Sequence, residues 1–547
     1  MSASDRFNLI DRPWLLVRDQ TGAVREASLI DVFASAHRLS GLVGDVPTQV
    51  FATTRLLLAI LHRAVEGPAD LDDWEELWEA ETLPAAAIEE YLRQHEHRFN
   101  LDDPEVPFFQ VATLRKADDS FSDLSKLIAD VPNRHPFFTT RIGTELRLEP
   151  AEAARWVVHC QAFDPSGTKS GDPADQRTKG GRGYPIGVAW SGNLGGILVT
   201  GRNLRETLLL NLIPYEFQPQ EKEKADLPPW ERRQDGVGVE EDNREPTGPV
   251  DLYTWQSRRI RLAWEDTPQG RVVTGVLVGN GDRRTPQNMH PFEPHTCWRR
   301  SPNQEKKLRS NVPVYMPLAH DPERLIWRGL QSMLPESGAA SGADRLPATV
   351  LVWLGRLVVT GVLDRGYPVS VRTIGMKYGQ QDATVAEIVD DALNMRAILF
   401  DQGAAALIGV VKQAVENSES AARAIGRLAA NIELASGAGE TDGPRKEATE
   451  RAYGTLDPLF RAWLADLGPD SVPERVLAEW HGTALRALRQ LADDMVASAP
   501  PAAWTGRKDS NDRLITSIHA RAWCERDLRS AFSSAPQLAR QSDRSTA

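Results

Sequence analysis

The sequence contains few cysteines and no long apolar run, and each absence excludes a class of protein. Its three cysteines, Cys160, Cys297 and Cys524, lie far apart and form no Cys-x-x-Cys pair. This spacing excludes a disulfide framework and a thiolate zinc site. No run of eighteen apolar residues occurs, and the first residues contain no apolar signal core. We therefore expect a soluble, cytoplasmic protein with no membrane partner.

Motifs that carry catalysis are also missing. The chain contains no phosphate-binding P-loop, no His-Glu-x-x-His metal motif and no Gly-x-Ser-x-Gly nucleophile elbow. His290, His295 and Cys297 could hold a metal, but a zinc site needs about four ligands and this loop offers fewer. We expect no enzyme active site, no cofactor and no metal. A hydrolase with an unrecognised site is the least supported alternative.

The formal net charge of the chain is −12. A net negative charge repels the phosphate backbone, so it argues against a protein that coats nucleic acid through its overall charge. The charge is uneven, however, since residues 251–320 carry eleven Lys and Arg against six Asp and Glu. A local basic surface on an acidic body suits a subunit that touches nucleic acid at one place. Ordinary surface variation is the competing interpretation.

The apolar pattern predicts two domains of different character. With 547 residues, of which 41% are hydrophobic, the chain is too long for one ordinary core. From about Ala383 onward, apolar residues recur at three-and-four spacing in segments separated by polar loops, which predicts packed helices. The expected fold class is α+β. A large mixed α/β domain with irregular loops occupies residues 1–379, and an antiparallel four-helix bundle occupies residues 380–547.

Local signals predict the elements of the first domain. A turn at Asp19–Gly22 between two β-rich runs predicts a hairpin. We also expect helices over 29–40, 47–65 and 74–98 (with a break near Pro84), a strand and helix over 194–213, and a strand pair over 258–264 and 271–278.

A glycine-rich stretch is the most distinctive feature that is present. Glycines at 180, 181, 183 and 187 surround Arg182, and Lys179 precedes them. Residues without a Cβ allow the main chain to approach another molecule closely. Together with the two positive charges, this predicts a polyanionic ligand. A surface loop that contacts nothing is the alternative.

Four segments in order resemble the CasA family, the large subunits of Cascade, the type I-E CRISPR RNA-guided surveillance complex. They are FNLIDRPWLLVR at 7–18, VPFFQV at 106–111, GRNLRETLLLNLI at 201–213 and YTWQSRRIRL at 253–262. The resemblance covers about the first half of the chain, and the terminal helical bundle agrees with the family architecture.

The resemblance implies a non-catalytic subunit that recognises the protospacer-adjacent motif from the minor groove, helps open the duplex and recruits a helicase-nuclease. The implied partners are other Cascade subunits, the CRISPR guide RNA and double-stranded target DNA. In such complexes base pairing specifies the long target, and protein recognises a short adjacent duplex. The alternative is a protein-binding structural scaffold subunit without direct DNA readout.

By the same resemblance, the family's DNA-contacting glycine loop falls on Gly181, Arg182, Gly183 and Gly187, with Gly183 and Gly187 as the best candidates for close approach. The family's glutamine wedge, which props open the first target pair, falls on Gln381 or, as a second choice, Gln380. Two solvated glutamines that cap a helix are the alternative.

The family's lysine finger has no lysine at its position here, and Arg283 or Arg284 is expected to replace it unless both are simply solvated. A loop that docks beside the RNA and neighbouring subunits is implied for Arg134, Phe137, Phe138 and Arg141. Core packing of the two phenylalanines is the competing account. The family's Cys-x-Cys-Cys zinc knuckle is absent from this sequence.

Overall fold

The structure is a computed structural model that describes residues 6–129, 146–217, 225–239, 241–268, 270–335, 343–508 and 513–533. The chain divides into two compact units. Unit 1 comprises Met1–Glu323, Ala339–Leu354 and Val369–Ala392, and unit 2 comprises Arg324–Gly338, Gly355–Pro368 and Leu393–Ala547. The predicted division is a single cut after residue 379, whereas the observed units interleave along the chain.

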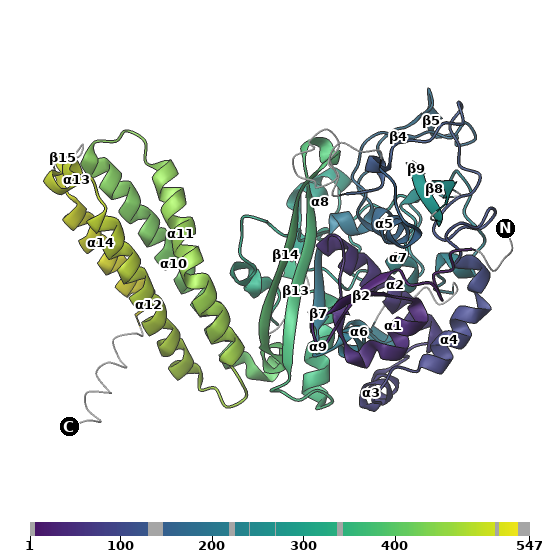
Figure 1. The fold of residues 1–547 in the computed structure, drawn as a ribbon. Coiled ribbons are helices and arrows are strands. Elements are labelled where there is room, and N and C mark those ends of the chain that lie inside the picture. The colour runs from purple at the N-terminus through teal and green to yellow at the C-terminus, as the bar shows by residue number, and fades with distance from the viewer. Residues whose placement is uncertain are drawn as a thin grey trace. The chain divides into compact units, whose positions relative to one another are not determined.

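Unit 2 is dominated by four long helices. They are α10 (Ala405–Ser436), α11 (Asp442–Asp466), α12 (Pro473–Ala497) and α14 (Ser517–Ala531), and Figure 1 shows them side by side. A short helix α13 (Pro501–Thr505) and a small ladder of β15 (Arg507–Lys508) and β16 (Leu514–Ile515) precede α14. The predicted four-helix bundle and the α+β class are confirmed.

Aromatic side chains hold the bundle together. The ring of Phe460 stacks on Trp327 at 4.7 Å and meets Trp480 edge-on at 5.1 Å, both between ring centroids. The indole of Trp480 donates to Ser418 Oγ at 3.1 Å, so its polar atom is satisfied inside the core. Helix α10 ends where Gly437 adopts a left-handed conformation with φ 96°, a common way to terminate a helix.

Unit 1 begins with the predicted hairpin. Strands β1 (Leu15–Asp19) and β2 (Val24–Ala27) pair antiparallel, and β3 (Leu39–Leu42) joins on the other side of β1. The helices that follow are α1 (Leu29–Ser35), α2 (Pro47–Ala64), α3 (Leu71–Glu79), α4 (Ala85–Gln94) and α5 (Pro150–Phe163). The predicted break near Pro84 is confirmed, because Pro84 caps α4.

Two further sheets of unit 1 position the site described below. Strand β7 (Gly195–Thr200) and α6 (Leu204–Asn211) form the predicted strand and helix, and β7 pairs with β13 (Pro368–Tyr378) in a sheet of order β14-β13-β7. Strands β4 (Lys169–Ser170), β5 (Thr178–Lys179) and β6 (Arg182–Gly183) form a small sheet of order β4-β6-β5.

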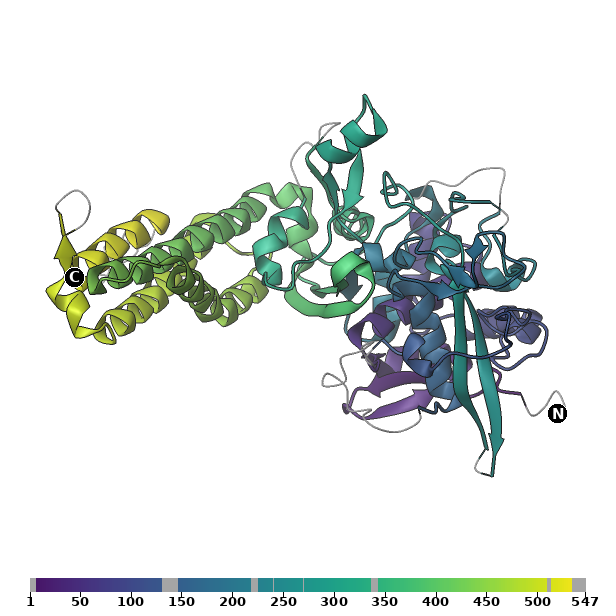
Figure 2. The same ribbon diagram turned by 90° about the horizontal axis from the view of Figure 1, so that it is seen from above.

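The predicted strand pair is also present in unit 1. Strands β8 (Arg258–Thr267) and β9 (Gly270–Asn280) form a long two-stranded ribbon (Figure 2). The remaining elements are α7 (Pro249–Tyr253), α8 (Pro302–Leu308), α9 (Thr349–Thr360) and a sheet of order β11-β10-β12 formed by β10 (Trp298–Arg300), β11 (Tyr315–Pro317) and β12 (Arg345–Leu346).

One predicted helix is wrong. The segment after Ala383 forms strand β14 (Val385–Arg396) beside β13, and not the first helix of the bundle. The neighbouring strand decides this outcome: Arg372 on β13 forms an ion pair with Asp390 on β14 at 2.7 Å, and Thr373 Oγ1 donates to the Asp391 carbonyl. Because a sheet is stabilised by residues distant in sequence, pairing overrides a weak helical period.

The core of unit 1 surrounds α2, which is buried along most of its length. Its buried residues include polar as well as apolar side chains, among them Thr48 and Arg55, so the polar groups need partners inside the core. Arg55 on α2 forms a buried ion pair: its NH1 lies 2.7 Å from Glu293 Oε1, and both side chains are at most 1% exposed. Trp190 Nε1 donates to the other oxygen of Glu293 at 2.7 Å. In the described part of the chain, no helix combines the length and apolar character needed to cross a membrane.

Candidate functional site

A cavity of about 540 Å³ opens in unit 1, and we call it the basic cavity. It is lined by five groups of residues, namely Lys116, residues 122 and 125–129, His159 with Cys160, residues 164–170, and Gly181 with Val278 and residues 383–385. The cavity therefore gathers segments that are separated by up to about 270 positions in the sequence. It is large enough for part of an extended ligand to enter.

The lining of the basic cavity is positively charged and rich in hydroxyl groups. Lys116, Lys126 and Lys169 line it, and Asp164 is the only carboxylate among its described lining residues. That carboxylate forms ion pairs with both Lys169 and Arg258. Serine and threonine hydroxyls occur at 122, 125, 166, 168, 170 and 384. Cations and hydroxyl donors around a carboxylate that is already paired suit an anionic ligand.

Two buried titratable groups that line the cavity, His159 and Cys160, stay neutral. Burial lowers the pKa of His159 to about 3, and its Nε2 lies 2.8 Å from Thr48 Oγ1. Burial also raises the pKa of the Cys160 thiol. At neutral pH the imidazole is thus uncharged and the thiol protonated, so neither supplies a charge or a thiolate nucleophile. The arrangement favours binding over covalent chemistry.

Residues 164–170 lead from the end of α5 through a bend into β4, and sequence reasoning missed this segment, which we call the turn at 164–170. Helix α5 ends at Phe163, and Gly167 follows with φ 116°, a conformation that favours glycine. A Cβ on Gly167 would lie 3.7 Å from the Cβ of Ala383, so this turn packs beside the β13–β14 connection. The signal in the sequence is Asp-Pro-Ser-Gly-Thr-Lys after a helix, in which turn residues precede a lysine.

The predicted glycine loop divides into exposed and buried positions. Gly181, Arg182 and Gly187 are exposed, and Gly181 lines the basic cavity. Gly183 is buried, and a Cβ there would lie 2.9 Å from Asn280 Nδ2. Its main chain is thus enclosed by protein, whereas Gly181 (φ 71°) and Gly187 (φ 108°) present backbone to solvent.

The predicted wedge glutamines lie at a tight turn between β13 and β14. Gln380 and Gln381 are exposed, Gln381 has φ 56°, and the next residues, 383–385, line the basic cavity. The hydroxyl of Tyr378 donates to the Phe163 carbonyl at 2.7 Å and so ties the end of β13 to the end of α5. Of the predicted glycine loop, Gly181 lines the cavity, and the predicted wedge lies two residues before the lining segment 383–385 without lining the cavity itself.

Arg283 and Arg284 have different surroundings. Arg284 is 9% exposed, donates to the Asn243 carbonyl at 3.1 Å and forms an ion pair with Glu245 at 3.3 Å. Arg283 is exposed at the surface. Of the two, Arg284 organises its own loop, and Arg283 is accessible to a partner.

The expected basic surface over residues 251–320 is only partly present. Five arginines of this region form ion pairs with carboxylates: Arg258, Arg259, Arg271, Arg284 and Arg300. Arg258 and Arg259 are buried with their partners Asp164 and Asp282. A count of charges along the sequence overestimates the exposed positive charge, because it ignores carboxylates supplied by other segments.

The candidate metal ligands do not form a metal site in the described structure. His295 and Cys297 are buried, and burial lowers the pKa of His295 well below its usual value and raises that of Cys297 to about 12. Among the residues that the structure describes, no group of three or more His, Cys, Asp or Glu could hold a metal ion. The predicted docking residues Arg134, Phe137, Phe138 and Arg141 lie outside the described residues.

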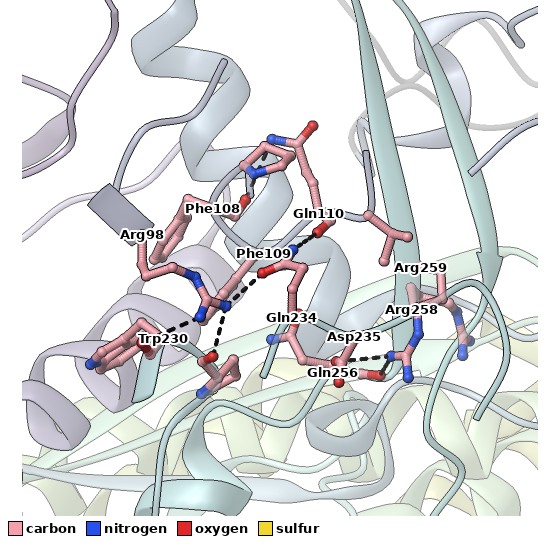
Figure 3. Close-up of a pocket in the computed structure, with 13 residues that line it drawn as sticks. Arg98, Phe108, Phe109, Gln110, Trp230, Gln234, Asp235, Gln256, Arg258 and Arg259 are labelled. Carbon is pink, nitrogen blue, oxygen red and sulfur yellow. Dashed lines mark hydrogen bonds and ion pairs between the residues drawn. The ribbon is translucent and has the colours of Figure 1, made fainter. Parts of the chain in front are cut away.

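A second, much smaller pocket of about 20 Å³ is lined by residues 107–111 of the VPFFQV segment (Figure 3). Its polar groups bind one another: Arg98 NH2 donates to the Pro229 carbonyl at 3.0 Å, and Gln234 Nε2 donates to the Gln110 carbonyl. Phe108 and Phe109 stack at 4.2 Å between ring centroids. Because a space of this size holds about one water, the segment contributes packing and not a ligand site.

Comparison with known proteins decides the family. The family model for CRISPR-associated protein Cse1 matches residues 8–491. The chain belongs to the Cse1 family. The resemblance found in the sequence is therefore confirmed, since a curated relative carries both names, CasA and Cse1.

Three relatives show how far the similarity extends. Thermobifida fusca Cse1 is 44% identical with a TM-score of 0.90, and the match covers 97% of this chain and 99% of that one. The CasA/Cse1 protein of Thermus thermophilus is 32% identical over 350 residues, which span 63% of either protein. A chain of a CRISPR RNA-guided surveillance complex, 18% identical with a TM-score of 0.69, shares the fold over 96% of this chain and 99% of that one.

Proposed function

We propose that this chain is the non-catalytic large subunit of a CRISPR RNA-guided DNA surveillance complex, in which it recognises the protospacer-adjacent motif through the minor groove. Membership of the Cse1 family supports the general role. The observation that supports the specific role is the basic cavity, because it is lined by Gly181 of the expected glycine loop and by residues 383–385, which follow the expected wedge. We further propose that the subunit helps open the duplex and recruits a helicase-nuclease.

Exposed glycine backbone beside positive charge suits the minor groove. The groove of B-DNA is about 6 Å wide and presents a degenerate pattern of acceptors, so close main-chain approach is useful there. Gly181 and the turn at Gly167 line the cavity together with Lys116 and Lys126. In this proposal the lysines contact phosphates and position the duplex, while the glycine backbone approaches base edges.

The exposed turn at Gln380 and Gln381 is the proposed wedge. Inserted side chains lower the cost of unstacking a base step, which amounts to a few kcal/mol. Arg283 is the proposed replacement for the family's lysine finger, since Arg284 already binds Glu245 and neighbouring carbonyls. Arginine is well suited to a narrow, electronegative minor groove.

The remaining partners are proposed from the family alone. We propose that the chain assembles with other Cascade subunits and the CRISPR guide RNA, and that Arg134, Phe137, Phe138 and Arg141 contribute to that contact.

The test is reconstitution with guide RNA and the other subunits, followed by binding to duplexes that carry a library of flanking motifs. Gly181→Asp places a carboxylate at the cavity and should lower affinity for the preferred motif at least about tenfold. Gly22→Asp is the matched control, because Gly22 is also exposed with positive φ (91°) but lies in the β1–β2 turn. Equal affinities of the two variants would refute this placement of the DNA.

A salt titration separates DNA recognition from a scaffold role. Each phosphate contact adds about 0.9 to the slope of log affinity against log salt. Lys116→Ala and Lys126→Ala should each reduce that slope by about one contact. If neither variant changes the DNA affinity of the assembled complex or its dependence on salt, the result favours the protein-binding scaffold.

A further inference from the structure

Arg258 is a buried arginine with an unusual set of partners. It begins β8 and its side chain is 1% exposed. Its Nε lies against the Asp164 carboxylate, and its NH2 group is within 3.2 Å of the Asp164 and Pro165 carbonyls and 2.8 Å from the Gly187 carbonyl. One guanidinium thus contacts two backbone segments, 164–165 and 187.

The same two segments are linked by further bonds. The Ala189 amide donates to the Asp164 carbonyl at 2.9 Å, and Lys169 Nζ donates to the Pro165 carbonyl at 2.8 Å while it pairs with Asp164. On the other side, Gln161 accepts from the Arg258 amide at 2.9 Å. The network joins the end of α5, the turn at 164–170 and the exposed Gly187 to a rigid strand.

We propose that Arg258 is a positioning residue for DNA recognition: without touching DNA, it sets the spacing between the turn at 164–170 and the loop at Gly187. This inference rests on the proposed function of the basic cavity. An arginine is required because its planar fork offers five donors in fixed directions, which a lysine lacks.

The first test measures the geometry without DNA. Hydrogen exchange of the complete chain is compared between wild type and Arg258→Lys, with attention to the amides of Ala189 and of residues 166–171. Exchange there should rise at least about tenfold, since a lysine ammonium keeps the charge but cannot bond the Asp164 carboxylate and the carbonyls of 164, 165 and 187 together. Arg259→Lys is the matched control, because Arg259 is also buried and paired, with Asp282 at 2.7 Å, but its described bonds go to other segments. Unchanged exchange in Arg258→Lys overturns the inference.

The second test measures DNA binding of the reconstituted complex. Arg258→Lys should discriminate between preferred and other flanking motifs about tenfold less well, or worse. Its salt dependence of DNA affinity should equal that of wild type, because no phosphate contact is removed. Suppose that hydrogen exchange rises in Arg258→Lys, yet the variant discriminates between flanking motifs as well as wild type does. These segments then do not recognise the motif, and the inference fails. If wild type itself shows no motif preference, the proposed function fails first.

A milder variant covers the case in which Arg258→Lys yields no folded protein. Asp164→Asn removes the carboxylate partner and leaves the carbonyl acceptors of Arg258 at 164, 165, 187 and 257 in place. Asp164→Asn should raise exchange of the Ala189 amide about threefold over the control Arg259→Lys, which is less than the increase expected for Arg258→Lys. No increase over that control overturns the positioning role.

Discussion

Acidification should destabilise unit 1 through its buried histidines, and the contributions of His62 and His159 can be worked out from their pKa values. Burial lowers the pKa of His62 to about 4 and that of His159 to about 3, from 6.5 in each case. Each ring keeps one hydrogen bond in its neutral form: His62 Nδ1 donates to the Gly67 carbonyl at 2.9 Å, and His159 Nε2 lies 2.8 Å from Thr48 Oγ1. Unfolding releases both rings to water, where they take up protons near pH 6.5.

The sign and the size follow from proton linkage. Below pH 6.5 the unfolded chain binds more protons than the folded chain, so the free energy of unfolding decreases as the pH falls. The loss begins at the unfolded pKa and ends only near the folded values of about 4 and 3. Between pH 7.5 and pH 5, each histidine removes about 2 kcal/mol of stability, and together they remove about 4 kcal/mol.

Denaturant titrations at pH 7.5, 6.5 and 5 measure this effect. His159→Gln cannot take up the proton, so it should reduce the pH-dependent loss by about 2 kcal/mol, and a variant that also carries His62→Gln should reduce it by about 4 kcal/mol. His97 is exposed, and His97→Gln is the control expected to behave as wild type. If the double variant loses as much stability as wild type, the linkage argument is refuted.

The remaining predictions concern packing and capping. Gly192→Ala would place a Cβ 2.2 Å from the Tyr378 hydroxyl, so we expect a loss of about 1–3 kcal/mol in the free energy of unfolding and faster exchange of the amides around Phe163; unchanged thermal unfolding would contradict this contact. Ser28 caps α1 by accepting from the Asp31 amide at 3.1 Å, so Ser28→Ala should cost about 1 kcal/mol in denaturant titrations, with no loss if the cap is not formed. Leu464 on α11 is fully buried, so Leu464→Ala should lower the free energy of unfolding of the bundle, followed by circular dichroism, by about 2–5 kcal/mol. The control Leu434→Ala changes an exposed residue and should alter that free energy by about 0.5 kcal/mol or less. Similar losses in the two variants would show that the assigned core is wrong.

Local signals in the sequence predicted many elements correctly. The turn at Asp19–Gly22, the break near Pro84 and the bundle helices all depend on residues within a few positions of one another. The segment that became β14 was predicted incorrectly, because its partner β13 supplies the ladder and the ion pair from Arg372. A local period is a weak signal wherever pairing with another segment is available.

The candidate site was predicted only in part for the same reason. The glycine stretch and the glutamines were visible as residue types, but the cavity that Gly181 lines depends on where α5, the small β4-β6-β5 sheet and the β13–β14 turn meet. The turn at 164–170 was not predicted as part of the site, because its role depends on contacts with distant residues such as Arg258 and Ala189. The burial of Gly183 against Asn280 is likewise invisible along the chain.

The sequence by itself determined the family, the two kinds of architecture and the candidate segments, because these depend on short motifs and on periodicity. Only the tertiary structure decided which cations stay accessible. Arg258 and Asp164 are 94 positions apart, yet they neutralise each other inside the protein, while Lys116 and Lys126 line the cavity. Burial and ion pairing depend on neighbours in space, and a linear sequence does not specify those neighbours until it folds.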